Sequence, residues 1–182
     1  MDLVAGIKER RSIRRFQEKA VPRELIEEVV EVARFAPSWK NTQTARYIVI
    51  DDKEKIAALA NEKCTFGFDF NIKTIAKAPA VVLLTIVEGR SGFEKDGTFS
   101  TPKGDRWQTF DAGIAAQTFC LAAYEKGLGS VILGYFDDDE IKKVVEIPEG
   151  QQVGAIIPIG FLPEKETAAP PRKEVGELLT FI

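Results

Sequence analysis

The first regular apolar pattern in the chain follows Pro22, a residue that suits the first turn of a helix. Its apolar side chains recur every three or four positions, at Leu25, Ile26, Val29, Val30, Ala33 and Ala36. This spacing predicts an amphipathic helix of about 14 residues. Pro37 ends the helix, because proline disfavours α geometry at the residue before it.

Other apolar runs are short, rich in β-formers and free of helical spacing, which predicts strands. These runs are Tyr47–Ile50, Ala80–Val87, Ser130–Leu133 and Val153–Ile159. The first two contain no charged residue, as is typical of strands buried on both faces. Further helices are predicted at Lys53–Asn61 and Asp137–Val145, the latter begun by acidic residues that suit its dipole.

The longest predicted helix is Trp107–Lys126, ended by Gly127 as a C′ residue. Between Ala112 and Tyr124 it carries no charge and is rich in small residues, so we expect it to be buried on all sides. Before it, residues 88–106 hold four glycines, one proline and eight charges. A loop this polar and long is typically a lid or disordered, and we favour a lid.

Four strands alternating with five or six helices predict a single α+β or α/β domain, residues 1–182, with helices over a central sheet. The tail, residues 162–182, ends in the apolar run Leu178–Ile182, which needs a partner surface to bury it.

Composition narrows the function. The chain is 45% hydrophobic, 29% charged and has a net charge of −3, as expected of a soluble globular protein. It has neither the ~18-residue apolar run of a membrane span nor a secretory leader, which predicts a cytoplasmic protein. The two cysteines are expected to be reduced thiols. Histidine is absent, which removes the commonest general base and metal ligand, and we predict no metal site.

Basic residues gather at the N-terminus, where five of the eight residues from Lys8 to Arg15 are Lys or Arg. This pattern suits a solvated helix end, but clustered guanidinium groups can also bind phosphate oxygens through bidentate hydrogen bonds. A nucleic-acid site is disfavoured, because the chain is acidic and has no wider basic face. A second basic pair, Arg172-Lys173, follows two prolines.

The loop 37–43 concentrates Ser, Asn, Thr and Gln just after a helix. Such side chains commonly cap turns, and they can equally bind the carbonyl and amide edge of a heterocycle. Leu133-Gly134 follows a predicted strand, where glycine lets a ligand approach the backbone closely.

The order of these features resembles the FMN-dependent nitroreductase family over nearly the whole chain. The motifs that carry the resemblance are Arg10-Arg11-Ser12-Ile13-Arg14-Arg15-Phe16, Ala36-Pro37-Ser38 through Gln43, Ala78-Pro79-Ala80-Val81-Val82, Asp111–Ala123 leading to Gly127-Leu128-Gly129, and Pro171-Arg172-Lys173.

The resemblance implies a three-layer α+β sandwich with a central, mostly antiparallel sheet, in an intertwined homodimer with two FMN sites at the interface. It also implies which residues bind the flavin. These are Arg10, Arg11, Ser12, Arg14, Pro37, Trp39, Asn71, Ile132, Leu133, Gly134, Arg172 and Lys173, joined from the other subunit by Ser38, Asn41 and Gln43. Two departures bear on substrate shape: Gln43-Thr44-Ala45 replaces the usual Gln-Pro-Trp, and Trp39-Lys40 separates Ser38 from Asn41.

The resemblance further implies an oxidoreductase in which FMN carries the chemistry and no side chain is catalytic. NADH or NADPH would reduce the flavin, which would then reduce a nitroaromatic, quinone or enone in a ping-pong cycle. One alternative is a flavin store or redox sensor without turnover. Another is an interaction domain whose Lys8–Arg15 cluster docks a partner.

Overall fold

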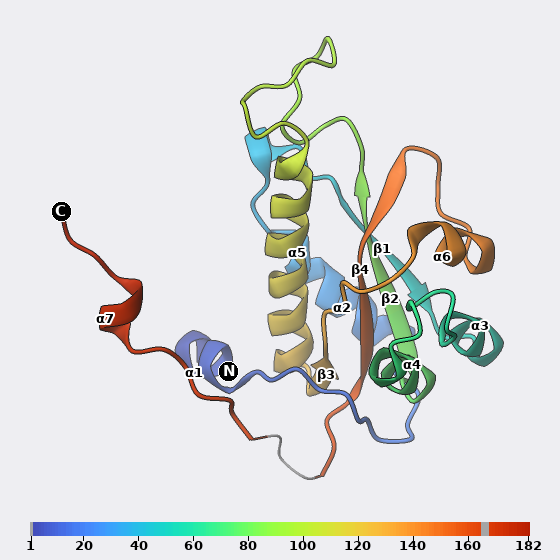
Figure 1. The fold of residues 1–182 in the computed structure, drawn as a ribbon. Coiled ribbons are helices and arrows are strands. Elements are labelled where there is room, and N and C mark those ends of the chain that lie inside the picture. The colour runs from blue at the N-terminus through green and yellow to red at the C-terminus, as the bar shows by residue number, and fades with distance from the viewer. Residues whose placement is uncertain (1, 165–167) are drawn as a thin grey trace.

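The computed structural model describes residues 2–164 and 168–182. Within these residues one antiparallel sheet is formed, in the order β1-β2-β4-β3 (Figure 1). Its strands are β1 (Ala45–Ile50), β2 (Ala80–Val87), β3 (Leu128–Ser130) and β4 (Gln151–Phe161). The two longest strands therefore occupy the centre, where both faces are covered, and β1 and β3 form the edges.

Helices cover both faces of the sheet. The long helix α5 (Arg106–Glu125) packs with α2 (Arg23–Ala33) on one face. On the other face lie α3 (Lys53–Leu59), α4 (Asp69–Ala76) and α6 (Asp138–Val144), as Figure 1 shows. The remaining helices are α1 (Leu3–Glu9), the 3-10 turn η1 (Trp39–Asn41) and α7 (Val175–Leu178). The predicted three-layer sandwich is confirmed.

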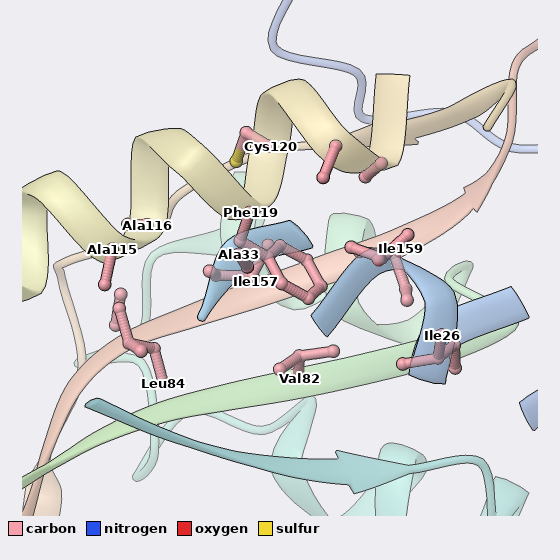
Figure 2. Packing of buried hydrophobic residues seen from close by; sticks show 14 of the residues in the cluster. Ile26, Ala33, Val82, Leu84, Ala115, Ala116, Phe119, Cys120, Ile157 and Ile159 are labelled. Atoms are coloured by element: carbon pink, nitrogen blue, oxygen red, sulfur yellow. The ribbon is translucent and has the colours of Figure 1, made fainter. Parts of the chain in front are cut away.

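Strand alternation divides the core into two layers. In β2, Val82 and Leu84 face α2 and α5, whereas Val81 and Leu83 face the opposite helices. Figure 2 shows Phe119 of α5 reaching down among the side chains of the central strands. All these residues are completely buried, which explains why β2 tolerates no charge on either face.

Most predicted elements are confirmed, with small shifts at their ends. The expected burial of β1 on both faces is wrong, because β1 is an edge strand and its Val49 is 37% exposed. The helix α5 begins one residue earlier than predicted, and Gly127 follows it with a φ of 74°, as a C′ residue should. The predicted strand Ser130–Leu133 is displaced, because the pairing with β4 begins at Leu128 and Leu133 forms only an isolated bridge with Ile156.

One helix of the sandwich, α4, was not predicted. It has eight residues, and its buried face includes the polar side chains of Asn71 and Thr74. These polar residues share the buried face with Ile75, so the apolar pattern that marks a helix is weak there.

The expectation that α5 is buried on all sides is wrong for the single chain. Phe110 is 58% exposed, and Gly113 and Gln117 one and two turns further along the helix are also exposed. The chain therefore leaves one uncharged face of α5 open. The tail also has no cover: residues 168–182 are exposed throughout, with Phe181 at 88%.

No helix in the described part of the chain is both long and apolar enough to cross a membrane. Both cysteines, Cys64 and Cys120, are buried and unpaired, as predicted.

Phe119 is expected to be the most sensitive position of the core, because it is fully buried and stacks on Tyr47 with ring centroids 5.3 Å apart. We predict that Phe119→Ala lowers the free energy of unfolding by about 3–5 kcal/mol, measured by urea denaturation. The exposed Lys55→Ala is the control and should stay within about 0.5 kcal/mol of the parent. A loss below about 1 kcal/mol at Phe119 would contradict the described packing.

Candidate functional site

The N-terminal segment after α1 lies along the edge of the sheet beside β3. The N–H of Ile13 donates to the carbonyl of Ser130 at 2.9 Å, and Ser12 pairs with Ser130 in a parallel bridge. This close approach requires Gly129, because a Cβ there would lie 2.7 Å from Ile13. Since the segment is extended and Ile13 is buried, its neighbours Ser12 and Arg14 face the other way, outward.

Two of the predicted arginines are available to a ligand, and one is engaged within the chain. The Nε of Arg10 is buried without a hydrogen-bond partner. Arg14 is exposed, with its guanidinium 5.3 Å from the ring centre of Phe70, and it makes one hydrogen bond, to the carbonyl of Ser12 at 3.2 Å. Arg11 instead donates to the carbonyls of Lys8 and Arg10, and so closes the end of α1. The anion-binding capacity of this segment therefore rests on Arg10 and Arg14.

The predicted residues Asn71 and Ile132–Gly134 lie together on the described fold. Asn71 is 5% exposed, and its side-chain amide donates to the carbonyl of Tyr135 at 3.4 Å. The N–H of Leu133 donates to the carbonyl of Ile156 at 2.8 Å, so it is already paired within the fold. Gly134 is exposed with open space beside its Cα, and it is the member of the pair whose backbone a ligand can reach.

An aromatic patch adjoins these residues. Phe66, Phe68, Phe70 and Tyr135 are 47–55% exposed, and their rings contact one another at centroid distances of 5.2–6.2 Å. Exposed rings in contact are a surface that planar ligands can stack on. The sequence analysis missed this patch, although three phenylalanines within five positions were its signal.

The second set of predicted residues forms the loop 38–43, which has a strained backbone. Lys40, Asn41 and Gln43 have φ angles of 44°, 54° and 49°, the left-handed region that favours glycine. Such residues cost about 1–3 kcal/mol each and concentrate at functional sites. The hydroxyl of Ser38 accepts from the N–H of Gln43 at 2.9 Å, so it closes the loop on itself.

Buried contacts fix this loop to α5. The carboxylate of Asp111, which is 5% exposed, accepts from the N–H of Trp39 at 3.0 Å and from the hydroxyl of Ser91 at 2.6 Å. The ring of Trp39 packs against Trp107 with centroids 4.5 Å apart. Ser91 belongs to residues 88–106, which we name the covering segment because its Glu94 pairs with Lys40 of the loop at 2.8 Å.

A groove of about 720 Å³ runs beside this loop, between α2, β1 and α5. Its lining includes Ser38 and Gln43 of the loop, the apolar residues Ile26 and Val30 of α2, and Tyr47 of β1. The hydroxyl of Tyr47 is buried without a partner, and burial raises the pKa of Tyr47 to about 12. Charged residues such as Arg23, Arg46 and Asp111 also line the groove, so it has a mixed lining with an unpaired hydroxyl in its wall.

The two sets of residues lie at opposite ends of α5. The loop 38–43 is bound to Asp111, near the start of α5. The N-terminal segment lies beside β3, the strand that comes directly after the other end of the helix (Figure 1). Fourteen residues separate Asp111 from Glu125, which is about 21 Å along a helix. A single chain therefore does not bring the predicted site together.

Arg172 and Lys173 stand apart from both sets. Both are exposed in the tail, and Arg172 donates only to the carbonyls of Pro170 and Pro171 among the described contacts. Residues 2–164 and 168–182 contain no group of three His, Cys, Asp or Glu side chains placed to hold a metal ion.

Comparison with known proteins gives one consistent result. The sequence model of the Nitroreductase family matches residues 7–65 and 69–161. A Methanothermobacter thermautotrophicus protein, provisionally named an NADH dehydrogenase/NAD(P)H nitroreductase, is 30% identical over 165 residues, covering 88% of this chain and 78% of the relative.

Solved structures agree. A nitroreductase family protein from Streptococcus pneumoniae TIGR4 has a TM-score of 0.83 at 23% identity, covering 99% of this chain and 100% of that chain, which speaks for the fold alone. An oxidised iodotyrosine deiodinase, solved with FMN and 3-iodo-L-tyrosine, has a TM-score of 0.76 at 26% identity and covers 95% of this chain and 96% of that chain.

Proposed function

The chain belongs to the nitroreductase family, and on that premise we propose that it is an FMN-dependent oxidoreductase that transfers hydride from NADH or NADPH to a small oxidised acceptor. The relative from M. thermautotrophicus carries NAD(P)H nitroreductase in its name, and the similar deiodinase was solved with FMN. The acceptor class that we propose is a nitroaromatic, a quinone or an enone.

The residues of the N-terminal segment fit the phosphate end of FMN. Arg10 has a buried Nε that lacks a partner, Arg14 is exposed beside it in the chain, and Ser12 faces the same way. Guanidinium groups bind phosphate oxygens strongly, since the hydrogen bonds are charge-assisted. This basic segment, in which no arginine is paired with a carboxylate among the described ion pairs, is, in a chain of this family, the observation that carries the proposal.

We further propose that the complete site is built by two copies of the chain. The arginines and the loop 38–43 are held at opposite ends of α5, so a second copy must supply one of the two sets to a common ligand. The open uncharged face of α5, the groove beside β1 and the exposed tail are surfaces that such a homodimer would cover.

When bound, FMN would supply hydride storage between the two substrates. The chain's part is to bind and to orient. Arg10 and Arg14 would bind the negatively charged phosphate. The exposed side-chain amides of Asn41 and Gln43 can form hydrogen bonds with the edge of a heterocycle, and the backbone of Gly134 is open to a ligand atom. This division of labour explains how a chain without histidine can be an oxidoreductase.

The aromatic patch supports a planar acceptor. Its rings lie next to two candidate flavin residues, since the guanidinium of Arg14 lies over the ring of Phe70 and the amide of Asn71 donates to the carbonyl of Tyr135. A planar substrate that stacks on these rings would lie beside the flavin. A flavin store or redox sensor remains the second candidate function, favoured by the covering segment, which is tied to the loop 38–43 by the Lys40–Glu94 ion pair.

We predict that purified protein supplied with FMN is yellow and that NADH or NADPH added without oxygen bleaches it. A quinone or nitroaromatic added next should restore the colour, because both substrates reach the same bound cofactor. Absorbance spectra follow both steps. A protein that binds FMN but resists bleaching would be a store or sensor, and one that binds no FMN would rule out the proposal.

Steady-state kinetics test the order of the two substrates. Donor and acceptor are expected to take turns at one site, so double-reciprocal plots at several fixed acceptor concentrations should give parallel lines. Intersecting lines would mean that both substrates are bound together, which contradicts a ping-pong cycle.

Arginine variants test the phosphate site. Arg14→Ala should weaken FMN binding about 10- to 100-fold, because a hydrogen bond to a charged group contributes about 1.5–3 kcal/mol. Arg172→Ala should have the same effect, since we propose that the tail, which stands apart in the single chain, joins the phosphate site in the dimer. Arg15→Ala is the matched control and should leave the affinity nearly unchanged. Flavin fluorescence quenching measures all three, and equal losses would refute the assignment.

A further inference from the structure

Asp111 is a buried carboxylate whose partners are all neutral. It is 5% exposed and accepts hydrogen bonds from the N–H of Trp39, at 3.0 and 3.2 Å to its two oxygens, and from the hydroxyl of Ser91 at 2.6 Å. Within residues 2–164 and 168–182 it forms no ion pair. Burying a carboxylate without a cation opposes folding, so its presence calls for an explanation in what it holds.

What Asp111 holds is the start of a strained loop. Lys40, Asn41 and Gln43 all adopt left-handed backbone angles, and such residues persist only where the surroundings over-determine them. The end of the loop is fixed by its own neighbours, since Arg46 donates to the carbonyl of Gln43 at 2.8 Å. The start has Asp111, through Trp39.

The covering segment also contacts the strained loop and Asp111. Lys40 pairs with Glu94 at 2.8 Å, and the hydroxyl of Ser100 donates to the same carboxylate oxygen at 2.6 Å. Ser91, also of the covering segment, is completely buried against Asp111. One carboxylate therefore ties together α5, the strained loop and the covering segment.

We propose that Asp111 is a positioning residue, whose carboxylate holds the loop 38–43 in the strained form that binds the flavin. Asn41 and Gln43 are exposed, and their side-chain amides have no partner among the described hydrogen bonds, so the fixed loop presents both amides outward. The inference rests on the proposed function only for the identity of the ligand. The contacts of Asp111 with the loop and the covering segment do not depend on which ligand binds.

Tryptophan fluorescence tests the anchoring without any flavin. Both tryptophans of the chain, Trp39 and Trp107, lie at this contact. In the FMN-free protein, Asp111→Asn should shift the emission to longer wavelength and increase quenching by acrylamide, because the amide removes the charge that holds the Trp39 N–H. Unchanged emission and quenching would overturn the proposal.

Two more variants distinguish a local change at the loop from a general loss of stability. Thr85→Val removes a buried hydrogen bond to Gln151 elsewhere in the sheet, so its emission should match the parent even if its melting temperature falls. Ser91→Ala keeps the carboxylate and removes one donor. It should shift the emission in the same direction as Asp111→Asn but by less, and remains informative if Asp111→Asn does not fold.

FMN affinity then tests the link to binding. Asp111→Asn should weaken FMN binding about 10- to 100-fold, whereas Thr85→Val should stay within about twofold. In the Asp111→Asn background, Lys40→Gly should recover about fivefold, because glycine adopts the left-handed angle without strain. Lys40→Ala removes the same ion pair but keeps a Cβ, and should recover nothing.

The outcomes separate the two claims. If the parent protein binds no FMN, the proposed function fails, while the emission data still decide whether Asp111 anchors the loop. If the parent binds FMN and Asp111→Asn binds it equally well, the positioning role is wrong. Equal effects of glycine and alanine at Lys40 would show that strain is not what Asp111 opposes.

Discussion

Phe119 and the small residues around it pack α5 against the central strands (Figure 2). This contact determines where the two halves of the candidate site lie, namely the loop 38–43 and the N-terminal segment. The helix carries the anchor of the loop 38–43 near its start and leads, at its end, into the strand that seats the N-terminal arginines. Because a helix is rigid and about 1.5 Å long per residue, the two halves cannot approach each other within one chain. The distance that separates them is thus a property of the core, and it is the reason for our proposal that a second copy completes the site.

The sequence predicted most of the sandwich because its apolar periodicity is strong. The uncharged run Ala80–Val87 became the central strand β2 with the same bounds, and the uncharged stretch of α5 lies in the predicted helix. Pattern reasoning failed where polar residues are buried or where pairing decides the element: α4 buries Asn71, and β3 is displaced because its register with β4 starts at Leu128. Burial of α5 was overestimated, since periodicity does not tell whether a neighbouring surface belongs to the same chain.

For the candidate site, residue types led to a set of candidate residues but did not predict the structural roles that several of them have in the fold. Arg11 closes α1, the Leu133 N–H is paired with Ile156 and Ser38 fastens its own loop, which no sequence pattern could distinguish from ligand contacts. The left-handed angles of Lys40, Asn41 and Gln43 were equally hidden, because glycine, the usual marker of such angles, is absent from the loop. Strain of this kind is maintained by tertiary contacts, here Asp111 and the covering segment, and is therefore visible only in the fold.

The central claim is that FMN is bound by two copies of the chain together, and sedimentation velocity tests it most directly. Protein saturated with FMN is sedimented over a range of concentrations and followed at the visible absorbance of the flavin. The account predicts that all bound flavin sediments with a dimer, at one FMN per chain. Bound flavin that sediments with a stable monomer would contradict it, because one chain would then hold the flavin with only half of the predicted residues.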